Sequence, residues 1–506
     1  MDFTLPTIDW PTLTPVIAVV VTGVIALLIE IIFPKRNNAL IVGISLVGLA
    51  YAAYSLVPLF ATDSGYTAAH MVVRDHTGLA LQFVLIGICF LSFIFSDRYL
   101  REKGIAFGEF YPLALWTTAG GMIMVSTTNL LMMFLGLEVL SISLYCLVGM
   151  SRTEKRSEEA ALKYFLLGAF ASAFFLYGVA LIYGASGMID LRGIPLAFKT
   201  EYSEWLNLSV LGMFFILVGL LFKAALAPFQ QWAPDVYQGA PTNVTAFMSA
   251  ASKVAAFGAL YRVLFAASAT QSYWMEVMFW VAILTMVLGN VFAIAQRDVK
   301  RILAYSSIAH AGYILVGLLS HVRAPDKVGL EPVLYYLIGY SVMTIAAFAV
   351  LTLVATKGKD HTRLQDLNGM WKKSPLAAGT LVVCMISMVG IPPTVGFFGK
   401  LGFFQSALDA RLAPLAIVLA ITSAISVFYY WAIIRASLVD DESATGLRTS
   451  RMSPGLAATC VLGIIGVIGI GIMTNPVIKA LKKPASDTLM EELVEQPPED
   501  VVQSAG

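Results

Sequence analysis

Five charged residues lie inside stretches of the sequence that are otherwise apolar. They are Glu138, Lys163, Lys223, Lys253 and Lys400. A charged side chain at the centre of a lipid bilayer costs at least ~2.5–3.5 kcal/mol on insertion scales, and a lipid-facing helix offers nothing that offsets this cost. These residues should therefore face a protein interior or internal water, and they predict a path for protons or other ions.

Lysine can carry a proton only where its surroundings weaken its hold on that proton. Its pKa in water is about 10.4, but burial can bring the pKa of a lysine close to neutrality, and a neighbouring carboxylate acts in the opposite sense. The distance between Glu138 and Lys223 could thus decide whether a proton is kept or released. Moving one charge against 100 mV takes about 2.3 kcal/mol, which a change in pKa of about two supplies. This magnitude favours a lysine relay over a purely structural ion pair.

The position of each residue within its stretch sets how strongly it indicates function. Lys253 is central in its stretch, too far from either end for its side chain to reach an interface. Lys163 lies near the start of its stretch and could instead extend its stem to the membrane surface. His310, the one histidine within a predicted span, could be a core histidine or a relay group. Glu30, near the end of the first stretch, is expected to be interfacial.

The composition is that of a polytopic membrane protein. Of the 506 residues 58% are hydrophobic and 13% charged, and the mean hydropathy is +0.79, whereas soluble proteins have about 25% charged residues. The net charge of +1 gives no reason to expect nucleic-acid binding. The four cysteines stand singly in apolar stretches, without the spacing of a zinc or iron–sulfur site. Redox chemistry and bound cofactors are therefore not expected in this chain.

The apolar stretches predict an all-α fold with fourteen transmembrane helices, because a span needs about 20 apolar residues. The N-terminal segment lacks the basic region of a cleaved signal peptide, so the first stretch should be retained. Residues 484–506 are polar and acidic and predict a disordered tail. The predicted spans are 14–33, 39–60, 78–96, 112–128, 129–150, 158–187, 206–240, 241–266, 274–295, 299–319, 331–356, 375–409, 412–436 and 453–474.

Two of these stretches are too long for one straight span. Residues 206–240 and 375–409 would each form a helix of roughly 52 Å, against about 30 Å of hydrocarbon. Both contain Pro and Gly, among them Pro228 and Gly390, and proline interrupts helical hydrogen bonding. Two broken helices, the seventh and the twelfth, are predicted. Such breaks persist in membranes where protein or water surrounds them, and transporters bind their substrates there. Lys223 and Lys400 each lie close to one break.

A faint internal repeat divides the chain. The segments YFLLG (164–168) and YYLIG (335–339) match at an offset that spans five helices, and an odd number of helices inverts the second copy. We therefore expect two inverted five-helix repeats. The predicted divisions are helices 1–3 (1–111), the first repeat with helices 4–8 (112–273), the second repeat with helices 9–13 (274–436), helix 14 (437–483) and the tail (484–506).

The distribution of Lys and Arg predicts the orientation. With the N-terminus outside, the inner loops hold about twice as many basic residues as the outer ones, in accord with the positive-inside rule. Both termini are therefore predicted on the outer, periplasmic side.

Several segments resemble subunit N of bacterial complex I, the proton-translocating NADH:quinone oxidoreductase, which corresponds to subunit 2 of the mitochondrial and chloroplast complexes. The likeness covers about residues 10–475. The long C-terminal lateral helix of the paralogous subunit L is not expected in this chain. The segments that carry it are FLGLEVLSISLYCLVGM (134–150), EEAALKYFLLGAFASAFFLYGVALIYGASG (158–187), KAALAPFQQWAPDVYQGAPTNVTAFMSAASK (223–253), LGNVFAIAQRDVKRILAYSSIAHAGY (288–313) and MVGIPPTVGFFGK (388–400).

The resemblance implies a role for each residue of the relay. Glu138 and Lys223 match the family's pair on helices 5 and 7, and Lys253 matches its central lysine. Lys400 matches the residue of the second half-channel. Two further residues of the predicted relay have family counterparts: His310 matches a linking polar group and Lys163 the basic residue of helix 6. One departure is notable, since Gln230 and Gln231 stand where the family commonly has a histidine, and glutamine cannot titrate.

The resemblance also implies partners and a location. NADH or another donor, FMN, iron–sulfur clusters and quinone are expected in partner subunits. The partners are the other membrane-arm subunits, including neighbouring antiporter-like subunits, together with lipids and protons. The bacterial cytoplasmic membrane is the expected location, with a thylakoid or organelle membrane as an alternative.

Two other functions remain open from the sequence. The chain could be a subunit of a multisubunit cation/proton antiporter, which shares this fold, or a structural membrane scaffold. The segment 232–253 favours complex I over the antiporter, and the buried lysines disfavour the scaffold.

Overall fold

The computed structural model describes residues 8–33, 38–105, 108–198, 203–356, 359–439 and 452–485, and most of them are helical. The helices are α1 (Trp10–Ile32), α2 (Asn38–Leu56), α3 (His76–Lys103), α4 (Phe110–Val125), α5 (Leu130–Val148), α6 (Lys155–Ser186), α7 (Gly193–Ala197), α8 (Ser203–Ala224), α9 (Trp232–Gly239), α10 (Thr242–Ala266), α11 (Gln271–Ile294), α12 (Val299–Arg323), α13 (Glu331–Leu351), α14 (Met370–Lys373), α15 (Pro375–Val389), α16 (Val395–Asp409), α17 (Ala413–Leu438), α18 (Pro454–Ile472) and α19 (Thr474–Ala485).

The helices confirm a multi-pass membrane protein. Within the described ranges twelve of them are long and apolar enough to cross a membrane, and α4 and α15 are shorter apolar helices. A helix satisfies its own backbone hydrogen bonds, which is the condition for spanning lipid. The amphipathic helix α19 was not predicted, and it extends through Ala485, into the first residues of the expected tail. From residue 486 onward that expectation lies outside the described residues.

Two short hairpins correct the purely helical expectation. Strand β1 (Gly65–Thr67) pairs antiparallel with β2 (Val72–Arg74), and β3 (Ala355–Thr356) pairs with β4 (Lys359–Asp360). Strands of two or three residues are too short to display the alternating pattern by which a sequence indicates a strand. The second hairpin matters for the chemistry, because it brings Asp360 to the helix ends.

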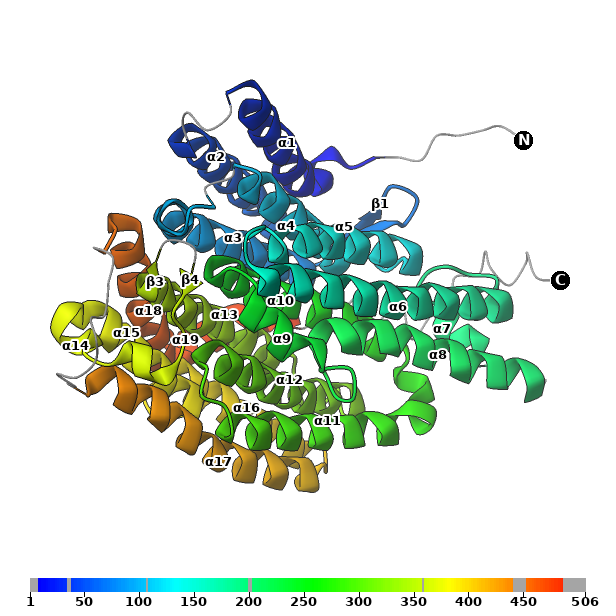
Figure 1. The fold of residues 1–506 in the computed structure, drawn as a ribbon. Helices are drawn as coiled ribbons and strands as arrows, with labels where there is room; N and C mark the ends of the chain where they lie inside the picture. The colour runs from blue at the N-terminus through cyan, green and yellow to red at the C-terminus, as the bar shows by residue number, and fades with distance from the viewer. Residues whose placement is uncertain are drawn as a thin grey trace.

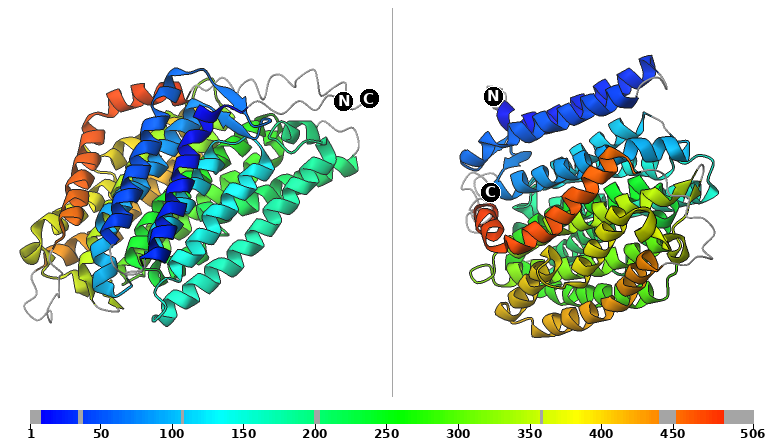
Figure 2. Two further views of the ribbon diagram at one scale, coloured as in Figure 1. Left: turned by 90° about the horizontal axis from the view of Figure 1, so that it is seen from above. Right: turned by 90° about the vertical axis from the view of Figure 1, so that its left-hand side faces the viewer.

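Helix α10 forms the centre of the molecule. It packs against α3, α4, α8, α12 and α13, and every one of its 25 residues is buried. Its many Ala, Ser and Gly residues allow neighbouring backbones to approach closely, as is typical of membrane helices. Helices α1 and α2 lie at one edge, and α17 lies on the opposite side of the bundle (Figure 1). The two further views show the long helices running side by side, with α1 at the rim (Figure 2).

The two predicted interruptions are present. Helix α8 ends at Ala224 and α9 begins at Trp232, while α15 ends at Val389 and α16 begins at Val395. Gly390 terminates α15 with φ +96°, a conformation that glycine adopts readily. Both breaks therefore free backbone carbonyls at the ends of helices inside the bundle, where buried donors can reach them.

Candidate functional site

Lys223 is held by hydroxyl groups in the last turn of α8. Its side chain is buried, and its Nζ donates hydrogen bonds to Ser141 Oγ at 2.9 Å and to Tyr164 OH at 3.0 Å. The ring of Tyr164 stacks on Trp232, with the ring centroids 4.5 Å apart. Because Trp232 begins α9, the second half of this broken helix supports the group that holds the lysine.

Glu138 is close to Lys223 but forms no ion pair with it. Among the described residues, no basic group lies within 4.0 Å of the Glu138 carboxylate, and its Oε1 is buried without a hydrogen-bond partner. Ser141, which accepts from Lys223, is three residues along α5, or roughly one helical turn of 5 Å. The structure therefore presents the predicted pair in an open arrangement, with a hydroxyl in the place of the carboxylate.

Lys253 lies at the middle of the central helix α10. Its ammonium donates to Ser307 O at 2.9 Å and approaches Ala224 O at 3.5 Å. Ala224 is the last residue of α8 and follows Lys223 directly. The face of the Tyr340 ring is 5.5 Å from the ammonium, and the Tyr340 hydroxyl donates to Ser307 Oγ at 2.8 Å. Lys253 thus bridges the first break and helix α12.

His310 joins the central lysine to the second half. It is buried on α12, one ring nitrogen contacts the Tyr336 hydroxyl, and Nε2 lies 2.8 Å from Tyr430 OH. The rings of Tyr340 and Tyr313 each lie 5.5 Å from the histidine ring. Tyr340 also contacts Lys253, and Tyr313 contacts Lys400, so the histidine lies between these two lysines.

Lys400 is held by the second break itself. Its Nζ donates to Met388 O at 2.7 Å, to Val389 O at 3.0 Å and to Ser423 Oγ at 2.8 Å. The two carbonyls belong to the end of α15. The ammonium also lies 5.0 Å from the ring of Tyr313, which links it to His310. A largely apolar crevice of about 300 Å³ between α15, α16 and α17 reaches this lysine from the side of the molecule.

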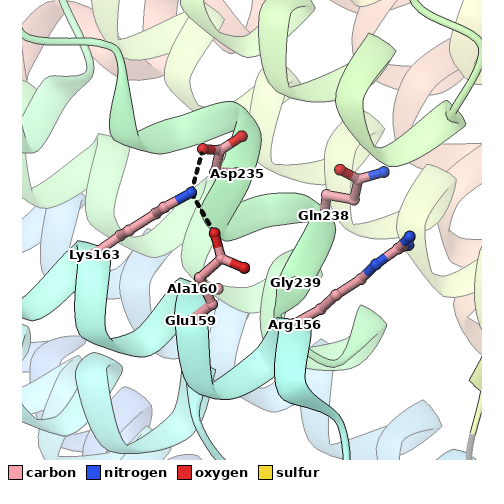
Figure 3. A pocket seen from close by; sticks show the side chains of 7 residues that line it. All are labelled: Arg156, Glu159, Ala160, Lys163, Asp235, Gln238 and Gly239. Carbon is pink, nitrogen blue, oxygen red and sulfur yellow. Dashed lines mark hydrogen bonds and ion pairs between the residues drawn. The ribbon is translucent and has the colours of Figure 1, made fainter.

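Lys163 lies apart from this buried line, at the surface. Its side chain is 43% exposed and forms ion pairs with Glu159 at 2.6 Å and Asp235 at 3.0 Å. Asp235 also pairs with Arg301 at 2.7 Å. Lys163, Glu159 and Asp235 line a polar pocket of about 170 Å³ at the ends of α6 and α9, in which the Lys163 ammonium points between the two carboxylates (Figure 3). The network ties α6, α9 and α12 together.

The glutamines at the first break differ from each other. Gln230 is buried and its Oε1 has no hydrogen-bond partner among the described residues, whereas Gln231 is exposed.

Arg262 and Glu30, two other charged residues near helix ends, form hydrogen bonds or ion pairs within the protein. Arg262 pairs with buried Asp75 at 2.6 Å and donates to Val125 O. Glu30, near the end of α1, is buried, and its carboxylate accepts a hydrogen bond from Gly108 N at 3.3 Å.

Sequence reasoning missed most of the polar groups that connect the lysines. These are hydroxyls and one amide on helices with an otherwise apolar composition, which resemble ordinary core residues. Two of them, Ser307 and Tyr313, have a signal in the sequence, the cluster of hydroxyl residues in the segment AYSSIAHAGY (304–313). The missed residues are Ser141, Tyr164, Asn290, Ser307, Tyr313, Tyr336, Tyr340, Ser423, Tyr429 and Tyr430.

The arrangement forms a row of exchangeable groups. From Lys223 the described contacts lead through Ala224 to Lys253, and from there through Ser307, Tyr340, His310 and Tyr313 to Lys400. The three lysines are 2–5% exposed, and none has a carboxylate within ion-pair distance among the residues that the structure describes. The lysines, the hydroxyls and His310 can exchange protons, whereas the Ala224 carbonyl and the ring faces of Tyr340 and Tyr313 cannot, so proton transfer along this row needs internal water at these contacts. In the described ranges no group of His, Cys, Asp or Glu is placed to hold a metal ion.

The comparisons with known proteins identify the family to which this chain belongs. Residues 127–426 match the family model described as "NADH:quinone oxidoreductase/Mrp antiporter, TM". The NADH-quinone oxidoreductase subunit N of Chloroflexus aggregans is 39% identical, over 95% of this chain and 98% of that protein. A chain of respiratory complex I from Thermus thermophilus is 33% identical and superimposes with a TM-score of 0.78, covering 93% of this chain and 99% of that chain.

A more distant structure shares the fold. A chain of the Mrp complex from Dietzia sp. superimposes with a TM-score of 0.82 at 20% identity, over 99% of this chain and 100% of that chain. By its family match and its identity to curated relatives over nearly its whole length, the chain belongs to the subunit N family of NADH-quinone oxidoreductase.

Proposed function

We propose that this chain carries protons across the membrane through the row Lys223, Lys253, His310 and Lys400, as an antiporter-like subunit of an NADH:quinone oxidoreductase. Redox chemistry in partner subunits supplies the energy. One observation carries the proposal: three buried lysines are joined by hydroxyls and carbonyls and not by ion pairs. A purely structural charge in this setting would need a fixed counter-ion to offset its desolvation.

Glu138 and Lys163 complete the proposed relay. The open distance between Glu138 and Lys223 would close when the lysine has to retain its proton, and open again when the proton moves on. Lys163, in its surface network, would couple the position of α9 to the neighbouring Tyr164, and thus to Lys223. Both roles depend on movements of a few ångströms that the break in this helix allows.

The finer architecture belongs to the same proposal. The twelve long apolar helices and the shorter α4 and α15 together would make fourteen spans, with inverted repeats over 112–273 and 274–436 flanked by 1–111 and 437–483. The matching N-caps of α5 and α12 support the repeat: Asn129 accepts from Met132 N and Asp298 from Arg301 N. Each cap residue also bridges to a later loop, Asn129 to Asp190 and Asp298 to Arg363.

The proposal includes partners and location. Other membrane-arm subunits, among them neighbouring antiporter-like chains, would flank this one, and NADH, FMN, iron–sulfur clusters and quinone would be bound by partner subunits. The membrane would be the bacterial cytoplasmic membrane, with both termini on the outer side, as the excess of Lys and Arg in the other loops indicates.

The test is purification of the chain from its native membrane with its associated subunits. We expect hydrophilic subunits with iron–sulfur clusters and donor-driven proton uptake in reconstituted vesicles. Association with hydrophobic subunits alone, together with sodium/proton exchange in the absence of an electron donor, would favour the cation/proton antiporter instead.

A further inference from the structure

A buried charged cluster lies at the end of the bundle where α3 ends and α6, α10 and α12 begin. We call it the Asp360 cluster: Tyr99, Lys103, Glu154, Thr242, Lys300 and Asp360. The Asp360 carboxylate accepts from Tyr99 OH at 2.9 Å, Lys103 Nζ at 3.0 Å and Thr242 Oγ at 2.9 Å, and Lys300 Nζ is 3.7 Å away. Lys103 also pairs with Glu154 at 3.0 Å. The relay proposed above does not use these groups.

Lys300 is buried and held in the same way as the lysines of the row. Its side chain is 1% exposed, and its Nζ donates to Ala240 O at 2.5 Å, the carbonyl at the end of α9. Lys253 and Lys400 likewise approach carbonyls at the ends of α8 and α15. Asp360, in contrast, is 11% exposed, so its side chain reaches solvent while that of Lys300, 3.7 Å away, does not.

A stripe of hydroxyls on α10 leads from this cluster to Lys253. Thr242, Thr245, Ser249 and Lys253 follow one another at spacings of three and four residues, which places them on one face of the helix. All four are buried. Beside the first of them, Asn243 is 0% exposed, and neither polar atom of its side-chain amide has a hydrogen-bond partner among the described residues. An unpartnered buried amide is a common mark of an internal water position.

Helix α12 gives an estimate of the distance between Lys300 and the site of Lys253. Lys300 and Ser307 are seven residues apart, which corresponds to the same face and to roughly 10 Å along the helix. The carbonyl of Ser307 is the one that holds Lys253. The Tyr237 side chain, which precedes Ala240 on α9, lies against Ser307. Polar groups thus line the interval between Lys300 and Lys253 from three helices.

We propose that Lys300 is the residue through which protons enter the row from this end, with Asp360 as its counter-ion and the hydroxyl stripe of α10 as the track to Lys253. This inference rests on the proposed function. A proton from water at the surface binds the neutral Lys300 amine beside Asp360. The Lys300 ammonium then gives up one N–H proton to the chain of water and hydroxyls, each of which passes on its own proton, and the neutral Lys253 amine receives the last one.

The charged and titratable groups around Lys300 come from each neighbouring element. They are Lys103 and Tyr99 of α3, Glu154 before α6, Asp360 of β4, and Asp298 at the start of its own helix. Lys103 and Glu154 offset each other through their ion pair. Asp360 is therefore the partner whose charge Lys300 balances, and a titratable group at position 300 is the requirement that the experiment tests.

The experiment measures donor-driven proton uptake by the assembled complex in lipid vesicles. Lys300→Arg keeps the charge and the donors, but arginine does not release its proton at physiological pH. We expect normal assembly and a proton uptake rate lower by about tenfold or more, since loss of one acid–base group slows proton transfer by 10²–10⁴. Arg262→Lys is the matched control: it also alters a buried cation paired with a carboxylate, on the other end of α10, and should retain the uptake rate.

A second variant tests whether proton uptake follows the protonation of the side chain at position 300. In Lys300→His the new side chain titrates near pH 6.5, so proton uptake should persist at pH 6 and fall steeply by pH 8, whereas the wild type should not show this acid-shifted profile. A structural cation that balances Asp360 would give the same profile, because histidine loses its charge over the same pH range, so the profile supports a carrier only together with loss of uptake in Lys300→Arg. If Lys300→Arg fails to assemble, the double variant Lys300→Gln/Asp360→Asn decides: with both charges removed, a structural role predicts recovered uptake, and a carrier role predicts that uptake stays low.

A third variant distinguishes the two proposals. If Lys253→Arg abolishes proton uptake while Lys300→Arg and Lys300→His both behave as the wild type, the entry site is wrong and the row stands. If Lys253→Arg also retains proton uptake, the proposed function itself fails. Equal losses in Lys300→Arg and Arg262→Lys would likewise overturn the entry site, because they would indicate a general effect of disturbing buried ion pairs.

Discussion

The two broken helices hold their lysines in different ways. In the first half, Lys223 precedes the break and donates to hydroxyls of two neighbouring helices. In the second half, Lys400 follows the break and donates to two carbonyls of the break itself and to Ser423. Hydroxyls can rotate, whereas backbone carbonyls at a helix end are fixed. The first site is therefore suited to releasing its ammonium, and the second to fixing its position.

The ends of the two halves differ as well. The bridge between Asn129 and Asp190 lies beside a partly exposed ion pair between Asp190 and Arg192, while the bridge between Asp298 and Arg363 lies beside the buried Asp360 cluster. We call these two places the Asp190 corner and the Asp298 corner. They differ in exposure, and among the described residues the Asp298 corner contains a buried lysine, Lys300, whereas the Asp190 corner contains none. On the entry site proposed above, the two halves exchange protons with their surroundings in different ways.

The largest effect is expected at the first break. Replacing Lys223 by Ala removes the ammonium that Ser141 and Tyr164 hold, so proton uptake should fall by about tenfold or more, the scale of losing one acid–base group, while the complex still assembles. Glu138→Ala should act in the same direction, since the lysine would lose the carboxylate that retains its proton. Proton uptake by reconstituted vesicles measures both. Wild-type uptake in Lys223→Ala would mean that the first break does not serve the row.

A smaller effect, on thermal stability, should distinguish the Asp298 corner, which lies beside the Asp360 cluster, from the Asp190 corner. Burial alone would raise the pKa of Asp360, but the ammonium groups of Lys300 and Lys103 outweigh it and hold this pKa below its usual value. A carboxyl whose pKa is lowered on folding stabilises the protein above its unfolded pKa of about 3.9, and this contribution is lost as the pH falls through the folded pKa. Asp360→Asn should therefore lower the unfolding temperature at pH 6, because it leaves buried ammonium groups uncompensated, at a cost of about 3–5 kcal/mol.

The pH dependence of the unfolding temperature provides the control for Asp360→Asn. Thermal unfolding of the solubilised complex should show the difference between wild type and Asp360→Asn shrinking as the pH falls below about 4. Asp190→Asn, at the more exposed corner, should change the unfolding temperature less, because ion pairs near the surface contribute little. An equal loss in both variants would remove the distinction between the corners.

The smallest effect is expected at Gln230. It is buried at the first break, where the family commonly has a histidine, and it cannot carry a proton. If the row passes from Lys223 to Lys253 through Ala224, Gln230→His should change proton uptake by less than about twofold, since no transfer step is altered. Loss of most uptake in an assembled complex would show that the glutamine has a specific role at this break.

The sequence predicted the spans, the two breaks and the charged residues, because each has a strong local signature: long apolar runs, proline and glycine, and charges where lipid excludes them. It did not predict the connections. Ser141, Tyr340 and Asn290 resemble core residues until the helices that carry them are packed. Lys300 stands beside Arg301 in a basic segment at a predicted helix end, so it resembled an interfacial residue. Its burial depends on the hairpin β3–β4, which has no sequence pattern of its own.

The central claim is that Lys253 acts as a proton carrier between the two halves. The most direct measurement is donor-driven proton uptake, together with quinone-linked turnover, in the assembled Lys253→Arg complex. Arginine keeps the positive charge but not the exchangeable proton, so the account predicts that proton uptake is blocked although the complex is intact. Proton uptake and turnover near the wild-type values would contradict the relay and make Lys253 a fixed charge.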